Sequence, residues 1–149
     1  MTESKIALRA PTEPEMEEFE FVVTPELNQQ YLYAEEDFHP RYIEETEDGP
    51  PIIHPALLLN RSNSSKRPSY SVEPGAGGLH TGEQTFFLNP ARIGKKLKVT
   101  WKLMGTYEKR GRPYTCIEIR IVDEDGLEIL RRIHHSTIAT KEFESQKKR

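Results

Sequence analysis

The second half of the chain alternates hydrophobic and polar residues with a period of two. Leu97, Val99, Trp101 and Leu103 alternate with polar residues, and residues 117–121 repeat the pattern. Side chains that alternate in this way lie on opposite faces of a β-strand. The pattern predicts four strands, at residues 80–88, 95–110, 112–124 and 127–140. Because the turns "NPARIG", "RGR" and "EDG" are short, they join antiparallel neighbours, and we expect an antiparallel meander.

The first half predicts a short strand followed by a helix. Residues 19–23 ("FEFVV") are rich in β-forming residues, with alternate side chains on one face. Thr24 and Pro25 then form a favourable helix start, as N-cap and first helical residue. Pro40 is expected to end this helix, because the residue before a proline is pushed out of the helical conformation. The residues expected to form one buried stripe along the helix are Leu27, Tyr31, Ala34 and Phe38.

The remaining segments complete an α+β organisation. Residues 52–60 ("IIHPALLLN") are apolar, and their length is compatible with a buried helix or a buried strand. Residues 61–78 are rich in Ser, Pro and Gly and are expected to form a loop. We predict a flexible N-terminal arm at 1–15, a single domain at 16–141 and a polar tail at 142–149.

Composition narrows the classes of protein. The chain has 149 residues, 35% of them hydrophobic, which is enough for one domain with a core. We expect no membrane span and no signal peptide, because no apolar stretch has the required length. The single cysteine excludes an internal disulfide and a cysteine zinc cluster, so a cytoplasmic protein is expected.

Charge is unevenly distributed along the chain. Residues 1–50 contain fourteen acidic and three basic side chains, whereas the rest contains ten acidic and eighteen basic ones. The basic part is expected to meet phosphates, as in coenzyme A or a nucleic acid, or to form solvated strand faces. Aromatic residues do not interleave with the basic ones as they do in single-strand binders, which argues against nucleic acid.

Several motifs together resemble those of the MaoC-like hot-dog hydratase and dehydratase family, in particular its FAS1-like dehydratase subgroup. They are "GLHTGEQ", the "PARIG" turn, the "YEKRGRPY" hairpin and the "DEDG" turn, preceded by "YLYAEEDFHPRY". The resemblance covers roughly residues 17–140, and the order and spacing of the pieces carry it. It implies a hot-dog fold, in which a curved antiparallel sheet wraps around a central helix. Residues 52–60 would then begin that helix, and a second hot-dog domain would accompany this one.

The resemblance also implies a chemistry, the reversible hydration of an enoyl thioester carried by coenzyme A or acyl carrier protein. The motif of the family is Asp-x-Asn-Pro-x-His, with the aspartate and histidine as catalytic pair. Asp37 and Pro40 match it, but His39 replaces the asparagine and Tyr42 replaces the histidine. A carboxylate and an imidazole suit this reaction because both can titrate near neutral pH. Asp37 and His39 can pair if the break at Pro40 turns both inward; the alternative is a solvated helix end, with His39 against the helix dipole.

Other residues are candidates for substrate binding. His54 precedes the apolar segment, where free backbone N–H groups suit a thioester oxyanion, or it is a capping or core residue. Gly78 ends a glycine-rich stretch that permits close approach to a ligand, and His80 follows it; the alternative is a flexible loop that ends in a strand. The basic residues expected to meet carrier phosphates are Lys95, Lys96, Arg110 and Arg112.

The sequence favours neither a metal nor a cofactor. No cluster of ligands has the spacing of a known metal site. His134 and His135 are expected on opposite faces of a strand, in structural roles, and Cys116 is expected to be a core thiol.

Three functions remain open at this stage. The first is an (R)-specific enoyl-thioester hydratase or 3-hydroxyacyl-thioester dehydratase that uses Asp37 with His39 or Tyr42. The second is a non-catalytic subunit that completes the acyl pocket of a catalytic MaoC-like chain. The third is an acyl-thioester binding protein without activity, or a protein in which only the dimer surface matters. All three imply a homodimer or a heterodimer with a second MaoC-like subunit, because one sheet leaves a long free edge.

Overall fold

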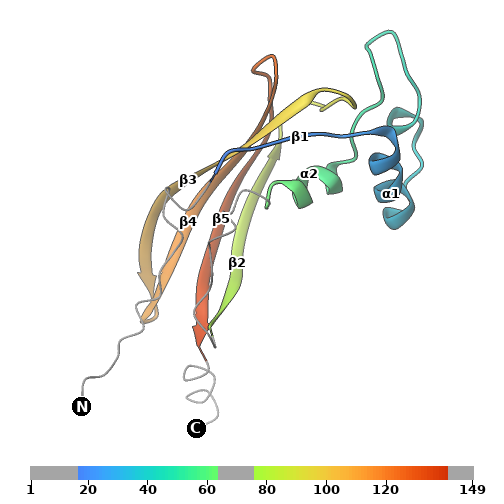
Figure 1. The fold of residues 1–149 in the computed structure, drawn as a ribbon. Coiled ribbons are helices and arrows are strands. Elements are labelled where there is room, and N and C mark those ends of the chain that lie inside the picture. Colours follow the sequence, from blue (N-terminus) through green and yellow to red (C-terminus); the bar gives the residue numbers. More distant parts are fainter. Residues whose placement is uncertain (1–16, 64–75, 141–149) are drawn as a thin grey trace.

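The computed structural model describes residues 17–63 and 76–140. These residues form a five-stranded sheet with two helices at one end of it (Figure 1). In chain order the elements are β1 (Phe19–Val22), α1 (Pro25–Glu35), a 3₁₀ turn (Pro40–Tyr42), α2 (Pro55–Arg61), β2 (Ala76–Phe87), β3 (Lys96–Lys109), β4 (Arg112–Asp123) and β5 (Glu128–Thr140). No helix in this described part is long and apolar enough to cross a membrane. The predicted arm at 1–15 and the predicted tail at 142–149 lie outside the described residues.

The sheet has the strand order β1-β3-β4-β5-β2, and every pair of neighbours is antiparallel. The four predicted strands are confirmed, and β3, β4 and β5 form a meander, but the turn "NPARIG" does not join neighbours as predicted, because β2 pairs with β5 and not with β3. β2 begins earlier than predicted, because Gly77 and Gly78 pair with Ala139 and Ile138 of β5 instead of lying in a loop. A partner strand long enough to reach them overrides the loop signal of their composition.

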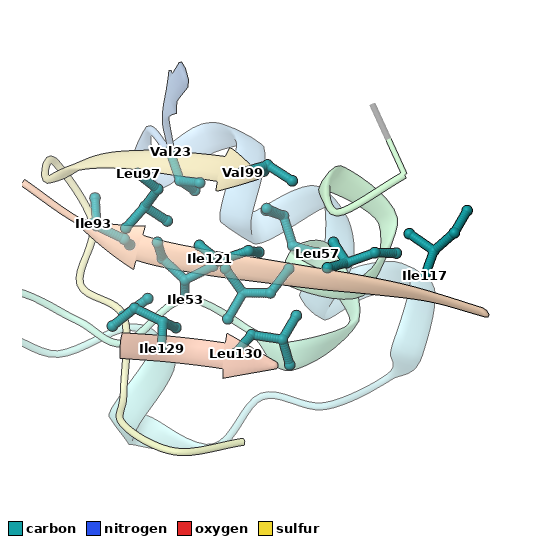
Figure 2. Packing of buried hydrophobic residues seen from close by; sticks show 13 residues of the cluster. Val23, Ile53, Leu57, Ile93, Leu97, Val99, Ile117, Ile121, Ile129 and Leu130 are labelled. Carbon is teal, nitrogen blue, oxygen red and sulfur yellow. The ribbon is translucent and has the colours of Figure 1, made fainter. Parts of the chain in front are cut away.

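A hydrophobic core lies between α2 and one face of the sheet. Thirteen buried residues form it, and Figure 2 shows Leu57 of α2 and the preceding Ile53 facing side chains of β3, β4 and β5. On the strands the core includes Leu97, Val99 and Ile121, on the alternate positions that the sequence predicted. The apolar segment is thus a helix, as the family resemblance implied, but it begins at Pro55, because His54 is the N-cap and Ile52 bridges to Arg92.

Helix α1 starts as predicted and ends earlier. The Thr24 hydroxyl accepts a hydrogen bond from the backbone N–H of Leu27 at 3.2 Å, which is the expected N-cap. The helix ends at Glu35, not before Pro40, because Glu36 adopts a left-handed conformation with φ of 53°. The predicted stripe is wrong at its far end, where Ala34 and Phe38 are exposed. The fully buried residues of α1 are Asn28 and Leu32, with Leu27 and Tyr31 partly buried.

Candidate active site

The end of α1 places Asp37 beside the start of α2. Its backbone N–H donates to the carbonyl of Leu32 at 3.0 Å. This hydrogen bond satisfies a terminal carbonyl of α1, just after the left-handed C-cap residue Glu36. The chain leaves the helix axis at this point, and the Asp37 carboxylate turns toward α2. The side chain of Asp37 stays 43% exposed, so water can reach it.

His54 completes a pair with Asp37 from the start of α2. Its ring atom Nε2 lies 3.2 Å from Oδ2 of Asp37, while Nδ1 accepts a hydrogen bond from the backbone N–H of Ala56 at 3.1 Å. An imidazole nitrogen that accepts an N–H carries no proton, so in the neutral ring the proton is on Nε2 and points to the carboxylate. His54 is therefore both the helix N-cap and the partner of Asp37, and only 8% of it is exposed.

The buried side chain of Asn28 holds this geometry from α1. Its amide oxygen accepts from the backbone N–H of His54 at 2.9 Å, and its amide nitrogen donates to the carbonyls of Tyr42 and Ile52 at 3.2 and 3.1 Å. One side chain thus joins three backbone positions around the Asp37–His54 pair. The sequence does not reveal this role of Asn28, because the only local signal of its hydrogen bonds to the backbone is a polar residue inside an apolar helical stripe.

Replacing Asn28 with Ala is expected to lower the free energy of unfolding by about 2–4 kcal/mol, because three buried backbone groups lose their partner. Urea unfolding of both proteins measures it, with an unchanged m-value. The matched control is Gln29→Ala on the exposed face of the same helix, which should cost less than about 0.5 kcal/mol. Equal effects of the two substitutions would contradict the bridging role of Asn28.

The structure separates the two predicted partners of Asp37. The backbone N–H of His39 donates to Oδ1 of Asp37 at 3.3 Å, but the His39 ring is turned elsewhere. Its Nδ1 accepts from the backbone N–H and from Nε of Arg41, both at 3.2 Å, and the residue is exposed. Tyr42 is buried, and its ring packs against that of His54 with 4.9 Å between centroids. The imidazole beside Asp37 therefore belongs to His54, and Tyr42 is its neighbour.

The expected oxyanion site at the start of α2 is not formed by the first N–H groups. The N–H of Ala56 is taken by the His54 ring, and the N–H of Leu57 donates to the His54 carbonyl at 3.0 Å. The start of α2 therefore contributes the His54 side chain to the site, and not free backbone N–H groups.

A cavity of about 250 Å³ is linked to the pair through Tyr42, although neither Asp37 nor His54 lines it. Its walls are largely apolar, and Tyr42, which packs on His54, is part of them. Arg41 also lines it, with its guanidinium 5.4 Å from the Tyr42 ring centroid. The apolar residues of the wall include Ile52, Ile53, Leu58, Phe87 and Leu88. Sequence analysis did not single out Arg41, although it lies inside the motif of Asp37.

The four basic residues predicted to meet carrier phosphates do not form one site. Lys95 and Lys96 lie at the start of β3, whereas Arg110 and Arg112 lie at its far end. An extended strand of this length separates them by about 40 Å. Lys95 is also committed to ion pairs, because its Nζ contacts the carboxylates of Asp123 and Asp125.

The remaining predicted residues lie along β2, β4 and β5. Gly78 and His80 belong to β2, where His80 contacts Glu83 and His134. His134 pairs with Glu83 and His135 with Gly82, so the two histidines face opposite sides of the sheet, as predicted. Cys116 is not the core thiol that was expected, because it is partly buried on the face of β4 opposite to Ile117; this partial burial raises the pKa of its thiol.

Solved structures share this fold. R-Hydratase PhaJ1 from Pseudomonas aeruginosa matches with a TM-score of 0.66 and 15% identity, over 89% of this chain and 84% of that one. A MaoC-like dehydratase from Rhodospirillum rubrum gives 0.66 and 14%, over 89% and 94%. A chain of the ChsH1-ChsH2 complex from Mycobacterium tuberculosis gives 0.62 and 8%, over 83% and 94%. No family model and no curated protein matches the sequence. The antiparallel sheet packed around α2 is the hot-dog fold found in MaoC-like dehydratases and (R)-hydratases, as the sequence predicted.

Proposed function

We propose that the chain is an enoyl-thioester hydratase, or in reverse a 3-hydroxyacyl-thioester dehydratase, with Asp37 and His54 as its acid–base pair. The observation that carries this proposal is the 3.2 Å contact between Oδ2 of Asp37 and Nε2 of His54. A carboxylate and an imidazole are the groups that hydration of an enoyl thioester requires. His54 thus replaces the imidazole that the family has at the position of Tyr42. The proposed substrates are enoyl thioesters of coenzyme A or acyl carrier protein, and the product of hydration is the (R)-3-hydroxyacyl thioester.

The hydrogen bonds of His54 assign different roles to the two residues. The N–H of Ala56 occupies the lone pair of Nδ1, which leaves Nε2 as the His54 nitrogen that faces Asp37. In this proposal His54 orients the carboxylate through Nε2, and Asp37 moves the proton. The Asp37 carboxylate takes a proton from water as the water oxygen bonds to Cβ of the enoyl group. The protonated Asp37 then gives the proton to Cα, and one water has been added across the double bond.

The apolar cavity supports an acyl substrate. Because Tyr42 touches His54 and also lines the cavity, an acyl chain in the cavity would bring its thioester end toward the pair. A volume of about 250 Å³ is below the 300–1,000 Å³ of typical ligand sites, which favours a short acyl group or a pocket that a second chain enlarges. Arg41 at the wall is the cation best placed to meet the carrier.

A non-catalytic role in a two-chain assembly is the second candidate. The departure from the family motif at Tyr42 favours it, and the ChsH1-ChsH2 complex shows this fold in an assembly of two different chains. β2 is an outer strand of the sheet, and Leu79, Phe86 and Phe87 on it are 39–53% exposed. An exposed strand edge with apolar side chains suits pairing with a second hot-dog chain, of the same or a different kind.

Hydration of crotonyl-CoA and of longer enoyl-CoA thioesters tests the proposal, with loss of the enoyl absorbance as the readout. We expect turnover by the purified chain, with sedimentation recording which assembly is present. Turnover that appears only after addition of a second hot-dog chain with its own Asp/His motif would favour the non-catalytic role. Binding of a saturated acyl-CoA without turnover in either setting would contradict an enzyme and favour a thioester-binding protein.

A further inference from the structure

A second polar cluster lies on the inner face of the sheet, beyond the end of α2 and apart from the Asp37–His54 pair. It consists of His80 and Glu83 on β2, and Arg132 and His134 on β5. The register places Glu83 opposite His134, and the β-bulge between His80 and Gly82 brings His80 to the same side. Such a concentration of polar groups is unusual on the core-facing side of a sheet, where burial without partners is costly.

Glu83 is the centre of this cluster. Its Oε1 accepts from Nε of Arg132 at 2.5 Å and its Oε2 from Nη2 at 2.8 Å. Arg132 is the main reason that the pKa of Glu83 falls to about 2, so the group is an anion at neutral pH. A carboxylate oxygen has two lone pairs, and one hydrogen bond leaves Oε2 able to bind a second group.

The two histidines approach the same oxygen of Glu83. Nε2 of His80 lies 3.0 Å from Oε2 and Nδ1 of His134 lies 3.8 Å from it, and the three donor atoms lie within 4.8 Å of one another. Two ligand atoms that each lie about 2.1 Å from a tetrahedral ion are about 3.4 Å apart. The distances of 3.0 and 3.8 Å from Oε2 lie on either side of this value. The rings are stacked, with 4.3 Å between centroids, and the half-exposed His80 leaves one side open to water.

We propose that His80, Glu83 and His134 form a binding site for a divalent transition-metal ion such as zinc, with water as the fourth ligand. Two imidazoles and one carboxylate are a ligand set that zinc accepts in open sites. All three ligands lie on two paired strands, and the stacked rings must tilt apart for both nitrogens to meet one ion, because an imidazole lone pair lies in the ring plane. The sequence predicts no metal site, because Glu83 and His134 are 51 residues apart along the chain and only the register of β2 with β5 brings them together.

Arg132 sets the expected strength of binding. Its positive charge remains next to Glu83 and repels a cation, so affinity should be lower than in a closed site with four protein ligands. The guanidinium also fixes the orientation of the carboxylate, as hydrogen-bonding partners of metal ligands commonly do. The proposal is independent of the proposed function, because none of these residues contacts Asp37 or His54 within the described part of the chain.

Isothermal titration of the EDTA-treated, tag-free chain with Zn²⁺ tests the site, and Co²⁺ absorption reports the ligand geometry. We expect one zinc per chain, and a loss of affinity of about tenfold or more in each of His80→Ala and His134→Ala. The exposed His80 keeps the test valid if His134→Ala does not fold. His39→Ala, on an exposed ring outside the cluster, should leave affinity unchanged.

Three results would overturn the proposal. One is the absence of zinc binding at millimolar metal. Another is zinc binding that neither His80→Ala nor His134→Ala weakens. The third is binding lost in His54→Asn or His135→Ala while both cluster variants retain it, since the ion would then occupy the Asp37 pair or the opposite face of the sheet, where His135 lies near Cys116.

Discussion

Replacing Asp37 with Asn is expected to reduce turnover of an enoyl-CoA thioester by about 10²–10⁴-fold, the usual consequence of losing an acid–base group. Asn has the same shape and still accepts hydrogen bonds, but it cannot take the proton from water. Because the Asp37 side chain is 43% exposed and stands outside the core, the fold should be retained. Steady-state kinetics of the chain in its active assembly, together with circular dichroism, measures both effects.

His54→Asn separates the role of the imidazole from that of the helix cap. Asn is a good N-cap, so α2 should form, but the hydrogen bond to Asp37 is lost. We expect a smaller decrease than for Asp37→Asn, about 10–100-fold, corresponding to one hydrogen bond to a charged group. His39→Ala is the matched control and should change turnover little. Full activity of Asp37→Asn in a two-chain assembly would assign catalysis to the other chain.

The strands could be predicted because their signal is local. Leu97 and Val99 are two residues apart on β3, and Ile121 belongs to the same alternating pattern on β4. All three side chains point into the core. The pairing of β2 with β5 joins residues some fifty positions apart, and no local pattern contains it. The loop expected at Gly77 and Gly78 shows the limit of prediction from composition. Composition describes a local preference, and pairing with the neighbouring strand β5 overrides it.

Of the two residues in the candidate pair, only Asp37 could be assigned its role from the sequence. Asp37 follows from the motif, but His54 lies seventeen residues away and reaches Asp37 through two features that act together. One is the left-handed conformation of Glu36, a residue type that rarely adopts it. The other is the amide of Asn28, which fixes the backbone of His54 from another helix. Neither can be derived from spacing, so His39, the histidine nearest in sequence, was the reasonable but wrong partner.

The polar cluster on β2 and β5 also determines how α2 is held. Arg132 is 6% exposed, and its Nη1 donates to the carbonyl of Leu59, to the hydroxyl of Ser62 and to the amide oxygen of Asn63. A cation at the C-terminal end of a helix satisfies the last carbonyls and interacts favourably with the helix dipole. Since Arg132 is also paired with Glu83, one side chain ties the end of α2 to both strands.

Arg132→Met is therefore expected to lower the free energy of unfolding by about 3–5 kcal/mol, the usual effect of breaking a buried ion pair. The substitution leaves the largely buried Glu83 anion without its guanidinium partner, with His80 and Thr85 among its remaining polar contacts, and removes the cap of α2. Arg131→Met is the matched control, because the neighbouring Arg131 is exposed on the other face, over the Phe86 ring. It should cost less than about 1 kcal/mol. Urea unfolding of the metal-free proteins compares the two, and equal losses would contradict the role of Arg132.

The same ion pair predicts a pH dependence of stability. The pKa of Glu83 is about 2 in the folded chain, against 4.5 for the free carboxyl group, so folding favours the ionised group. The contribution, about 3 kcal/mol, is fully present above pH 4.5 and is lost as the pH falls to 2. Glu83→Gln should lose stability at neutral pH, but should show a shallower decline between pH 4.5 and 2 than the unsubstituted chain. Parallel declines of the two proteins in that range would show that Glu83 is not the group whose protonation weakens the fold.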